Sequence, residues 1–324
     1  MNTFQPRVDL TSLTTAVDAI RAEVGKVIVG QHQTVDLLLT ALLADGHVLI
    51  EGVPGVAKTL TAKLLAKTMS VGFSRIQFTP DLMPSDVLGT SVFMPKTGDF
   101  SFRKGPIFSN LVLIDEINRA PAKTQAALFE VMEERQVTND GTTYHLDGPF
   151  MVLATQNPIE QEGTYRLPEA QLDRFLFKIV VGYPSESEEI AILRGNHQRR
   201  NLANALDAVN EVLTADQLAT LRAQVHQVHV DDKLFTYIAQ VVQGTRANKS
   251  LYLGASPRAS VALLNSSKAL ATLRGRDFIT PEDVQELAAP VLRHRVLLTP
   301  EREMEGSTAD DVVAQLIQKI DVPR

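Results

Sequence analysis

A glycine-rich segment that ends in Lys-Thr is the first part of this sequence whose residue types and spacing could do chemistry. Residues 52–59 read Gly-Val-Pro-Gly-Val-Ala-Lys-Thr, between an apolar run and an amphipathic helical pattern. Glycines let the backbone turn its N–H groups toward a bound phosphate, and the N-terminus of the following helix adds its dipole. Lys58 can reach the β- and γ-phosphates of a nucleotide, and the hydroxyl of Thr59 can ligate Mg²⁺. The segment therefore predicts a phosphate-binding loop.

The loop departs from the usual pattern at one position. Ala57 stands where a second glycine is expected, and we expect a small residue to fit there provided that its φ angle stays negative. The alternative interpretation is a strand-to-helix turn with incidental glycines, because short motifs produce false matches. The residues expected to bind nucleotide are Gly52, Val53, Pro54, Gly55, Val56, Ala57, Lys58, Thr59 and Leu60.

Two adjacent carboxylates follow another apolar run. Leu111–Ile114 is apolar at every position, and Asp115 and Glu116 come directly after it. ATP hydrolysis needs one carboxylate to hold magnesium and another to orient and polarise the attacking water. Because ligands bind at the carboxyl ends of parallel strands, we assign Asp115 to the metal, together with Thr59, and Glu116 to water activation. An acidic strand end at the surface would be the preferred interpretation if no phosphate loop preceded it.

Two further polar residues lie near predicted strand ends. Asn157 follows an apolar run, where its amide could contact both the γ-phosphate and the attacking water, although Asn-Pro alone is more typical of a turn. Arg174 follows a short helical pattern and precedes another apolar run. Taken alone, Arg174 would be interpreted as a surface salt-bridge residue.

Short apolar runs predict the strands that would position these groups, and helical patterns separate them. Runs without polar positions are typical of strands covered on both faces, as in a parallel sheet. The predicted strands are His47–Glu51, Ser74–Phe78, Leu111–Asp115, Phe150–Thr155 and Leu176–Val181, and the helices between them include Gln33–Ala44, Leu60–Met69 and Ala122–Glu134. This alternation indicates a doubly wound α/β layer.

The strand-like runs stop after Gly182, and only helical patterns follow, with Ser256 and Thr280 as N-caps before prolines. We therefore divide the chain into an N-terminal helical segment (1–28), an α/β nucleotide-binding core (29–182) and a helical lid domain (183–324).

The composition is that of a soluble globular protein. The 324 residues are 44% hydrophobic and 22% charged, with a formal net charge of −6. No basic tract stands out, so composition gives no reason to invoke nucleic acid or an anionic membrane. The absence of cysteine excludes disulfides and thiolate sites and is consistent with a cytoplasmic protein. The N-terminus lacks the apolar core of a signal peptide, and the longest apolar stretch is too short to span a bilayer.

Taken together and in order, these motifs resemble those of the AAA+ ATPases and, within them, the MoxR family. The segments that carry the resemblance are GVPGVAKT at 52–59, LIDEINRAPAKTQAALFEVMEERQVT at 113–138, ATQNPIEQEGTYRLPEAQLDRFLF at 154–177 and SPRAS at 256–260. Loops of the MoxR family also carry alanine before the lysine. The resemblance implies a P-loop NTPase fold of the AAA+ class, with a doubly wound parallel sheet core and a C-terminal all-α lid domain.

The resemblance also implies roles for individual residues. Asn157 is similar to the sensor-1 residue, Arg174 to the arginine finger that enters a neighbouring subunit's site, and Arg258 to sensor 2. Sensor 2 can act within a subunit or between subunits in related proteins, so its direction stays open. Val29 and Gly30 lie where AAA+ proteins contact adenine. A finger that works between subunits implies a closed homo-oligomeric ring, and the family suggests a hexamer.

Two insertions are expected to face the pore of such a ring. In the first, Val92–Met94 could pair with Phe100–Arg103; in the second, Gln136–Thr138 and Thr142–Tyr144 flank Asn-Asp-Gly, a hairpin turn signal. The candidate substrate contacts are the aromatic residues Phe93, Phe100, Phe102 and Tyr144. Packing of these aromatic rings against neighbouring elements is the alternative.

The leading hypothesis for function is a ring-forming, Mg²⁺-dependent ATPase that remodels or activates partner proteins in a chaperone-like manner. The resemblance suggests partners with von Willebrand factor A domains and work such as enzyme maturation or metal-cofactor insertion. A nucleic-acid motor is the second hypothesis, and the few basic residues of the predicted pore segments argue against it. A scaffold that binds ATP without turnover is the third, and the presence of Glu116, Asn157 and Arg174 gives no reason to prefer it.

Overall fold

A parallel sheet forms the centre of the molecule. The computed structural model describes residues 8–53, 55–158, 164–199 and 202–323. Its five-stranded sheet has the order β2-β5-β8-β1-β9, and all neighbouring strands run parallel. The strands are β1 (His47–Gly52), β2 (Phe73–Gln77), β5 (Leu111–Asp115), β8 (Met151–Gln156) and β9 (Phe175–Val181). The doubly wound α/β prediction is therefore confirmed, with each strand within one residue of its expected start and end.

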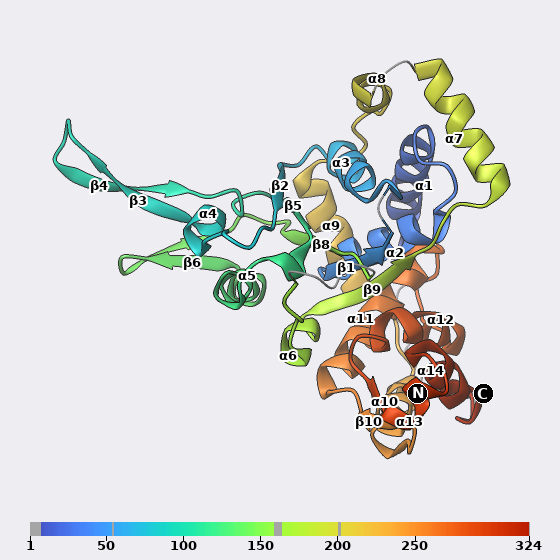
Figure 1. The fold of residues 1–324 in the computed structure, drawn as a ribbon. Helices are drawn as coiled ribbons and strands as arrows, with labels where there is room; N and C mark the ends of the chain where they lie inside the picture. The colour runs from blue at the N-terminus through green and yellow to red at the C-terminus, as the bar shows by residue number, and fades with distance from the viewer. Residues whose placement is uncertain (1–7, 54, 159–163, 200–201, 324) are drawn as a thin grey trace.

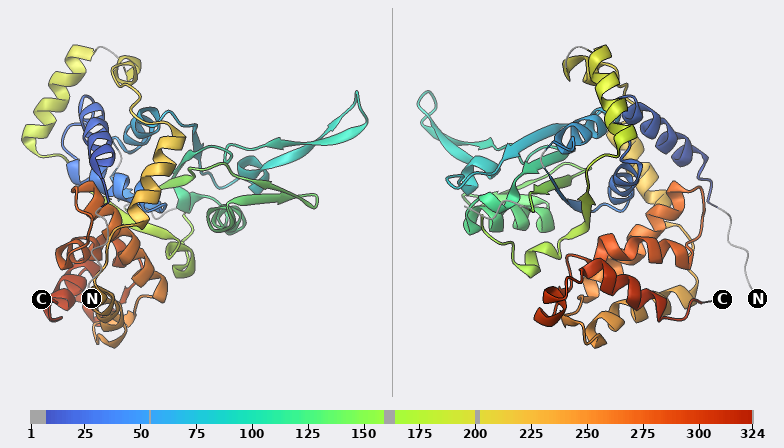
Figure 2. Two further views of the ribbon diagram at one scale, coloured as in Figure 1. Left: turned by 180° about the vertical axis from the view of Figure 1, so that it is seen from behind. Right: turned by 45° about the vertical axis from the view of Figure 1, so that its right-hand side comes forward.

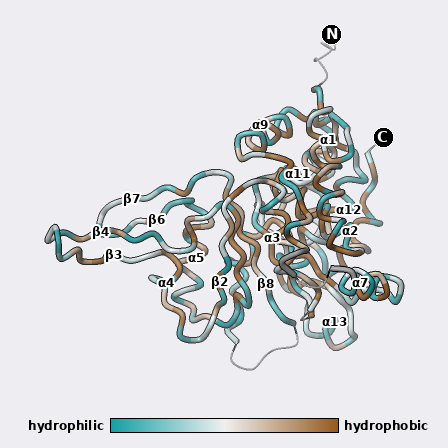
Figure 3. The backbone as a smooth tube through the Cα atoms, turned by 90° about the horizontal axis from the view of Figure 1, so that it is seen from above, coloured by the Kyte–Doolittle hydropathy of each residue, from teal (hydrophilic) through white to brown (hydrophobic). Residues whose placement is uncertain are grey.

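Helices cover both faces of this sheet (Figure 1). Side chains alternate between the two faces of a strand, so Val48 and Ile50 join one apolar core, whereas Leu49 joins the other. The first core contains α1 (Thr11–Gly25), α2 (His32–Leu43) and α3 (Lys58–Thr68), and the second contains α5 (Ala122–Glu134). Apolar segments gather around the sheet at the centre of the molecule (Figure 3). Short helical turns complete this part at α4 (Pro84–Leu88), η1 (Ile117–Arg119) and α6 (Glu169–Leu172).

The chain after β9 is mostly helical. Its helices are α7 (Glu186–Arg199), α8 (Leu202–Asp207), α9 (Ala215–His226), α10 (Asp232–Ala247), α11 (Pro257–Leu273), α12 (Pro281–Leu292), α13 (Pro300–Met304) and α14 (Ala309–Gln318). Helices α10–α14 gather in one bundle, whereas α7 lies apart beside α1 (Figures 1 and 2). One buried apolar cluster contains side chains of both α2 and α11. The division near residue 182 therefore stays a prediction.

The expectation of helices alone after Gly182 was wrong in one detail. Strand β10 (Leu251–Leu253) pairs antiparallel with β11 (Leu297–Leu298). Each strand follows the end of a long helix, and three residues are too few to show a strand period in sequence. Among the described residues, every helix is too short or too polar to cross a membrane.

Two hairpins project together from the sheet (Figures 1 and 2). They are β3 (Gly89–Met94) with β4 (Asp99–Lys104), and β6 (Gln136–Asn139) with β7 (Thr142–His145). Phe102 and Tyr144 stack across the hairpins with ring centroids 4.4 Å apart, so both rings pack rather than stand free. Phe93 and Phe100 face each other on the outer part of the first hairpin and are 50% and 72% exposed. The substrate-contact prediction therefore keeps its support only for Phe93 and Phe100.

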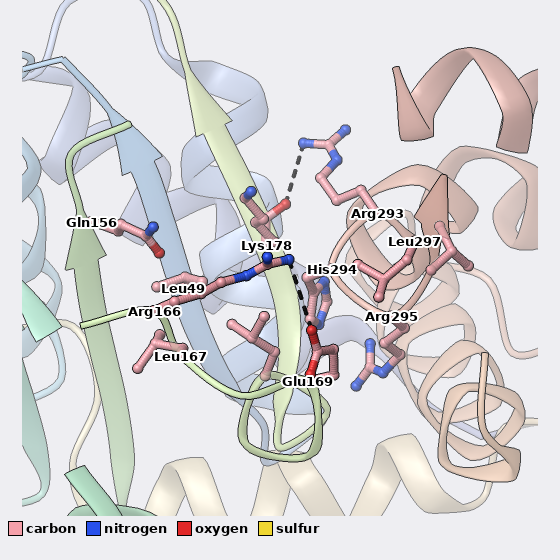
Figure 4. Close-up of a pocket in the computed structure, with 12 residues that line it drawn as sticks. Leu49, Gln156, Arg166, Leu167, Glu169, Lys178, Arg293, His294, Arg295 and Leu297 are labelled. Atoms are coloured by element: carbon pink, nitrogen blue, oxygen red, sulfur yellow. Dashed lines mark hydrogen bonds and ion pairs between the residues drawn. The ribbon is translucent and has the colours of Figure 1, made fainter. Parts of the chain in front are cut away.

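A cavity of about 200 Å³ lies between the sheet and the segment that follows α12. Arg293, His294 and Arg295 approach strand β9 from this segment (Figure 4). Most charged groups around the cavity have partners within the chain; Lys178, for example, lies 2.8 Å from Glu51. We therefore interpret the cavity as a packing gap at the junction between the sheet and the helical bundle.

The first residue of β1, His47, ties the sheet to α5. Its Nδ1 accepts a hydrogen bond from the backbone N–H of Val152 (3.0 Å), so its Nε2 carries the proton and donates to the carbonyl of Met132 (3.1 Å). Burial is the main reason that the pKa of His47 falls to about 4. The neutral ring is thus the form that the folded state holds.

Acidification should therefore destabilise the protein through His47. The His47 ring takes up a proton below about pH 6.5 in the unfolded state but only near pH 4 in the folded state. The stability that the neutral ring contributes is therefore complete above pH 6.5 and is lost as the pH falls toward 4. By pH 5 the loss should be about 2 kcal/mol. Urea unfolding at pH 7.5 and pH 5 measures it. His47→Asn should flatten the dependence, whereas the exposed His226→Asn should not; an unchanged slope in His47→Asn would contradict this account.

Candidate functional site

The loop after β1 has the backbone geometry of a phosphate cradle. Gly52 ends the strand, and a Cβ there would lie 2.7 Å from the carbonyl oxygen of Val181, so only glycine fits beside β9. Gly55 has φ +88°, in the left-handed region that glycine adopts freely. Val53, Val56 and Leu60 belong to the described part of the loop and helix, whereas Pro54 lies outside the described residues.

Ala57 corrects an expectation from the sequence. It has φ +56° and ψ +20°, a left-handed conformation, whereas we expected a negative φ. The turn into α3 imposes this conformation, because alternating left- and right-handed residues point successive N–H groups into one concavity. Alanine is the smallest residue that must bear the strain of a Cβ at positive φ. Ala57 therefore adopts a backbone conformation that is typical of glycine.

Lys58 is the first residue of α3 and folds back across the loop. Its Nζ donates a hydrogen bond to the carbonyl oxygen of Gly52 at 2.7 Å. Partial burial lowers the pKa of this ammonium, and the carboxylates of Asp115, Glu116 and Glu51 act in the opposite direction. The ammonium thus lies inside the cradle, between the loop and the two acids. Thr59 follows it in the first turn of the helix.

The predicted adenine segment contacts the same loop. Gln31, directly after Val29 and Gly30, donates from Nε2 to the carbonyl of Val56 at 3.1 Å. Gly30 has φ +66°, and a Cβ on it would lie 1.9 Å from a carboxylate oxygen of Glu188 on α7. Residues 29–31 are therefore enclosed between the loop and α7, although their role toward adenine stays a prediction.

Asp115 ends β5 with its carboxylate almost buried. One carboxylate oxygen lies 2.6 Å from Nε of Arg75 on β2, and the other accepts a hydrogen bond from Thr155 Oγ1 at 3.1 Å. Sequence reasoning missed both partners. Arg75 lies two residues before Gln77 and so on the same face of β2, but only the structure gives the register that pairs Gln77 with Asp115.

Glu116 follows in a left-handed conformation (φ +58°), which turns its side chain out of the strand direction. Its Oε2 accepts a hydrogen bond from Gln77 Nε2 at 2.8 Å and lies 2.9 Å from Nε of Arg119. Its backbone N–H donates to Thr155 Oγ1 at 3.1 Å, so one hydroxyl contacts both acids. Asn157 comes just after β8, the strand between β5 and β1. The loop, the two acids and Asn157 thus share the carboxyl edge of the sheet.

Arg174 and Arg258 lie elsewhere, at the opposite end of the sheet. Arg174 precedes Phe175, which pairs with His47 at the start of β1, whereas the loop follows Gly52 at its end. Five strand steps of about 3.3 Å separate these ends by roughly 16 Å. That length exceeds the reach of an arginine side chain. The phosphates of the chain's own loop are therefore out of reach of Arg174.

One carboxylate holds the two arginines together. Glu133, in the last turn of α5, lies 3.2 Å from Arg174 Nε through one oxygen and 2.9 Å from Arg258 Nη2 through the other. Arg258 lies in the first turn of α11, 125 residues along the chain from Glu133, so sequence spacing gave no sign of this pairing. The sequence-predicted site residues therefore form two groups at opposite ends of β1.

The residues at the carboxyl edge fit a magnesium–nucleotide complex. The cradle presents glycine or left-handed positions where a phosphate must approach the backbone, and Lys58 supplies a cation inside it. Thr59 and Asp115 supply hydroxyl and carboxylate oxygens, the ligand types that Mg²⁺ prefers. The donor set thus matches the metal assigned from the sequence.

Substituting glycine for the strained alanine should be harmless. Removing a Cβ from a left-handed residue relieves about 1–2 kcal/mol, partly offset by the roughly 0.5–1 kcal/mol entropy cost of glycine. Ala57→Gly should therefore leave stability unchanged or raise it by up to about 1.5 kcal/mol. Denaturant unfolding checks this. The matched control is Ala127→Gly, a half-buried alanine within α5, which should lose about 1 kcal/mol; an equal loss in Ala57→Gly would contradict the strain.

Comparison with known protein families gives two matches that follow the chain's architecture. Residues 47–177 match the model described as "ATPase family associated with various cellular activities (AAA)". Residues 243–316 match the model of the AAA lid domain. The first match includes the cradle, both acids, Asn157 and Arg174, and the second includes Arg258.

Individual relatives agree over nearly the whole chain. The uncharacterised protein YeaC of Bacillus subtilis is 48% identical over 93% of this chain and 92% of its own length. Chaperone MoxR1 of Mycobacterium tuberculosis is 44% identical over 93% of this chain and 81% of its own. A crystal structure from Cytophaga hutchinsonii, described as a candidate ATPase, superposes with a TM-score of 0.89 at 42% identity and 97% coverage of each chain. The chain therefore belongs to the MoxR family of AAA+ ATPases.

Proposed function

We propose that this protein is a Mg²⁺-dependent ATPase that works as a homo-oligomeric ring and remodels or activates partner proteins. The observation that carries the proposal is the division of the site residues between the two ends of β1. A cradle with two acids lies at one end, and two arginines bound to one carboxylate lie at the other. A head-to-tail ring brings the second group of one subunit to the first group of the next.

The residues at the carboxyl edge suit the chemistry of phosphoryl transfer to water. The cradle N–H groups and Lys58 would bind the phosphates, and Thr59 and Asp115 would hold Mg²⁺, which would supply charge neutralisation at the phosphates when bound. Glu116 orients the attacking water and accepts its proton. Gln77 and Arg119 hold the Glu116 carboxylate at the edge. Asn157 contributes an amide for the same water or for the γ-phosphate.

Arg174 and Arg258 stabilise the negative charge that develops on the transferred phosphate of the neighbouring subunit. Their shared contact with Glu133 supports one direction of action for both, so Arg258 also acts between subunits. We expect six subunits, as the family suggests. Hydrolysis in one subunit is then coupled to movement through the contacts that Arg174 and Arg258 make with the nucleotide of the neighbouring subunit.

The exposed face of the first hairpin supports a protein substrate. Phe93 and Phe100 present apolar surface on a projecting hairpin, which suits contact with polypeptide. The second hairpin adds Asp140, which is unsuited to gripping phosphates. The name of MoxR1 describes a chaperone. We place the protein in the cytoplasm, with a von Willebrand factor A domain protein as partner and with enzyme maturation or metal insertion as its work.

Replacing the proposed water-activating acid should separate binding from hydrolysis. Glu116→Gln keeps the shape of the side chain but cannot accept a proton, so kcat should fall by about 10²-fold or more while ATP affinity stays within about threefold. Phosphate release and fluorescent-nucleotide titration measure the two quantities. Glu134→Gln, an exposed acid on α5, is the control and should be fully active. Normal turnover in Glu116→Gln would refute its assignment.

A site shared between subunits predicts recovery on mixing. Lys58→Ala should lose nucleotide binding, and Arg174→Ala should bind ATP but not hydrolyse it. In mixed rings about one site in four combines an intact loop with an intact arginine, so turnover should return to roughly a quarter of the wild-type rate. Labelled subunits verify mixing. Lys58→Ala with Glu116→Gln damages the loop side in both and should not recover; absence of recovery with Arg174→Ala would sink the shared site.

A further inference from the structure

Strand β9 is an edge strand, and its free side is covered by side chains instead of another strand. An edge strand exposes unpaired backbone carbonyls. Three successive residues after α12 donate to these carbonyls: Arg293 Nη1 to Lys178 (3.2 Å), His294 Nε2 to Phe175 (2.9 Å) and Arg295 Nη1 to Leu176 (3.0 Å). Figure 4 shows this segment alongside β9. The helical bundle is thereby attached to the sheet along its edge.

Arg295 is the most constrained of the three. Its side chain is 3% exposed, and all of its N–H groups have acceptors in the chain. Nε donates to the carboxylate of Asp173 at 2.7 Å, and Nη2 donates to the carbonyl of the same residue at 3.0 Å. Burial lowers the pKa of this guanidinium, and the Asp173 carboxylate opposes the change. A charge this deeply buried depends on its partners staying in place.

Asp173 connects Arg295 to both arginines at this end of the sheet. It directly precedes Arg174 in the chain. Its other carboxylate oxygen accepts a hydrogen bond from Ser256 Oγ at 2.8 Å. Ser256 caps α11, and the same Oγ accepts the backbone N–H of Arg258 at 3.2 Å. The backbones that carry Arg174 and Arg258 are thus held by one buried ion pair.

The contacts of Glu133 show the result of this arrangement. Its two oxygens reach Arg174 and Arg258 separately, so the two guanidinium groups lie side by side, on either side of a single carboxylate. A carboxylate between two guanidinium groups occupies the kind of position that a phosphate takes in such a pair. All three side chains are partly exposed, and exchange for a phosphate therefore requires no unfolding.

We propose that Arg295 is a positioning residue: through Asp173 and Ser256 it presents Arg174 and Arg258 as one rigid pair to the triphosphate bound by the neighbouring subunit. Arg295 itself touches no nucleotide. The inference rests on the proposed function, because it assigns to Arg295 the alignment of residues that act between subunits. If Arg295 did no more than attach the helical bundle to the sheet, its loss would damage both halves of the site.

Arg295→Lys tests the assignment, because lysine keeps the charge but loses the planar fork. We expect at least about a tenfold loss of kcat, with nucleotide affinity and ring assembly unchanged, since misplaced arginines weaken only the transition state. Arg293→Lys, on the same segment but paired with Asp310 rather than Asp173, is the matched control and should stay active. Asp173→Asn carries the same test if Arg295→Lys does not remain folded at the assay temperature.

Mixing separates positioning from a general defect. Arg295→Lys subunits keep an intact cradle, so mixing with Lys58→Ala should restore turnover to roughly a quarter of wild type, because about one site in four is complete. Mixing with Arg174→Ala should restore none, since both variants damage the same half.

Three results would overturn the assignment of Arg295. The first is a wild-type kcat in Arg295→Lys, and the second is a loss of kcat in Arg293→Lys as large as that in Arg295→Lys. The third is that Lys58→Ala subunits restore turnover to Arg174→Ala but not to Arg295→Lys. If Lys58→Ala rescues neither variant, the shared site itself is wrong and the role of Arg295 falls with it.

Discussion

The parallel pairing of β1 with β9 decides which groups one chain can bring together and which it must keep apart. Gly52 lies opposite Val181 at one end, and His47 lies opposite Phe175 at the other. The phosphate cradle follows Gly52 at the first end, and Arg174 directly precedes Phe175 at the second end. Because a strand is a stiff spacer of about 3.3 Å per residue, no side-chain movement can bring these groups together within one subunit. The register of two strands is therefore the physical reason to expect a site shared between copies of the chain.

Most of the charged groups that the proposed chemistry needs are paired within the chain. Arg75 contacts Asp115, Arg119 contacts Glu116, and Glu133 contacts both Arg174 and Arg258. The pairs of Glu116 and Glu133 are partly exposed and contribute little to stability, so a bound nucleotide can replace one partner of these pairs at small cost. Such pairs keep charged side chains near their working positions. The buried pair of Asp173 with Arg295 differs, because removing either partner would leave an uncompensated charge in the interior.

Side-chain contacts attach the helical bundle to the sheet, and side-chain contacts also brace the two hairpins against each other. An edge strand must satisfy its carbonyls, and here a segment from the bundle does so with side-chain donors. The hairpins likewise hold each other through Phe102 and Tyr144 and through the hydrogen bond from Asn139 to Ser91 (2.7 Å). The stacking and the hydrogen bond join the two hairpins to each other. Phe93 and Phe100 thus lie on a hairpin that its neighbour braces.

Local chemistry was enough to predict the strands, the cradle and its two acids, because an apolar run or a Gly-rich turn acts over a few neighbouring residues. The hairpin at Asn139-Asp140-Gly141 was predicted for the same reason. Even there, the sign of φ at Ala57 was missed, since the geometry of the turn into α3 sets it. Only the tertiary structure brought Arg75 to Asp115, 40 residues away, Glu133 to Arg258, 125 residues away, and Arg295 to Asp173, 122 residues away. No sequence period encodes such pairings, because they depend on where separate elements meet in space.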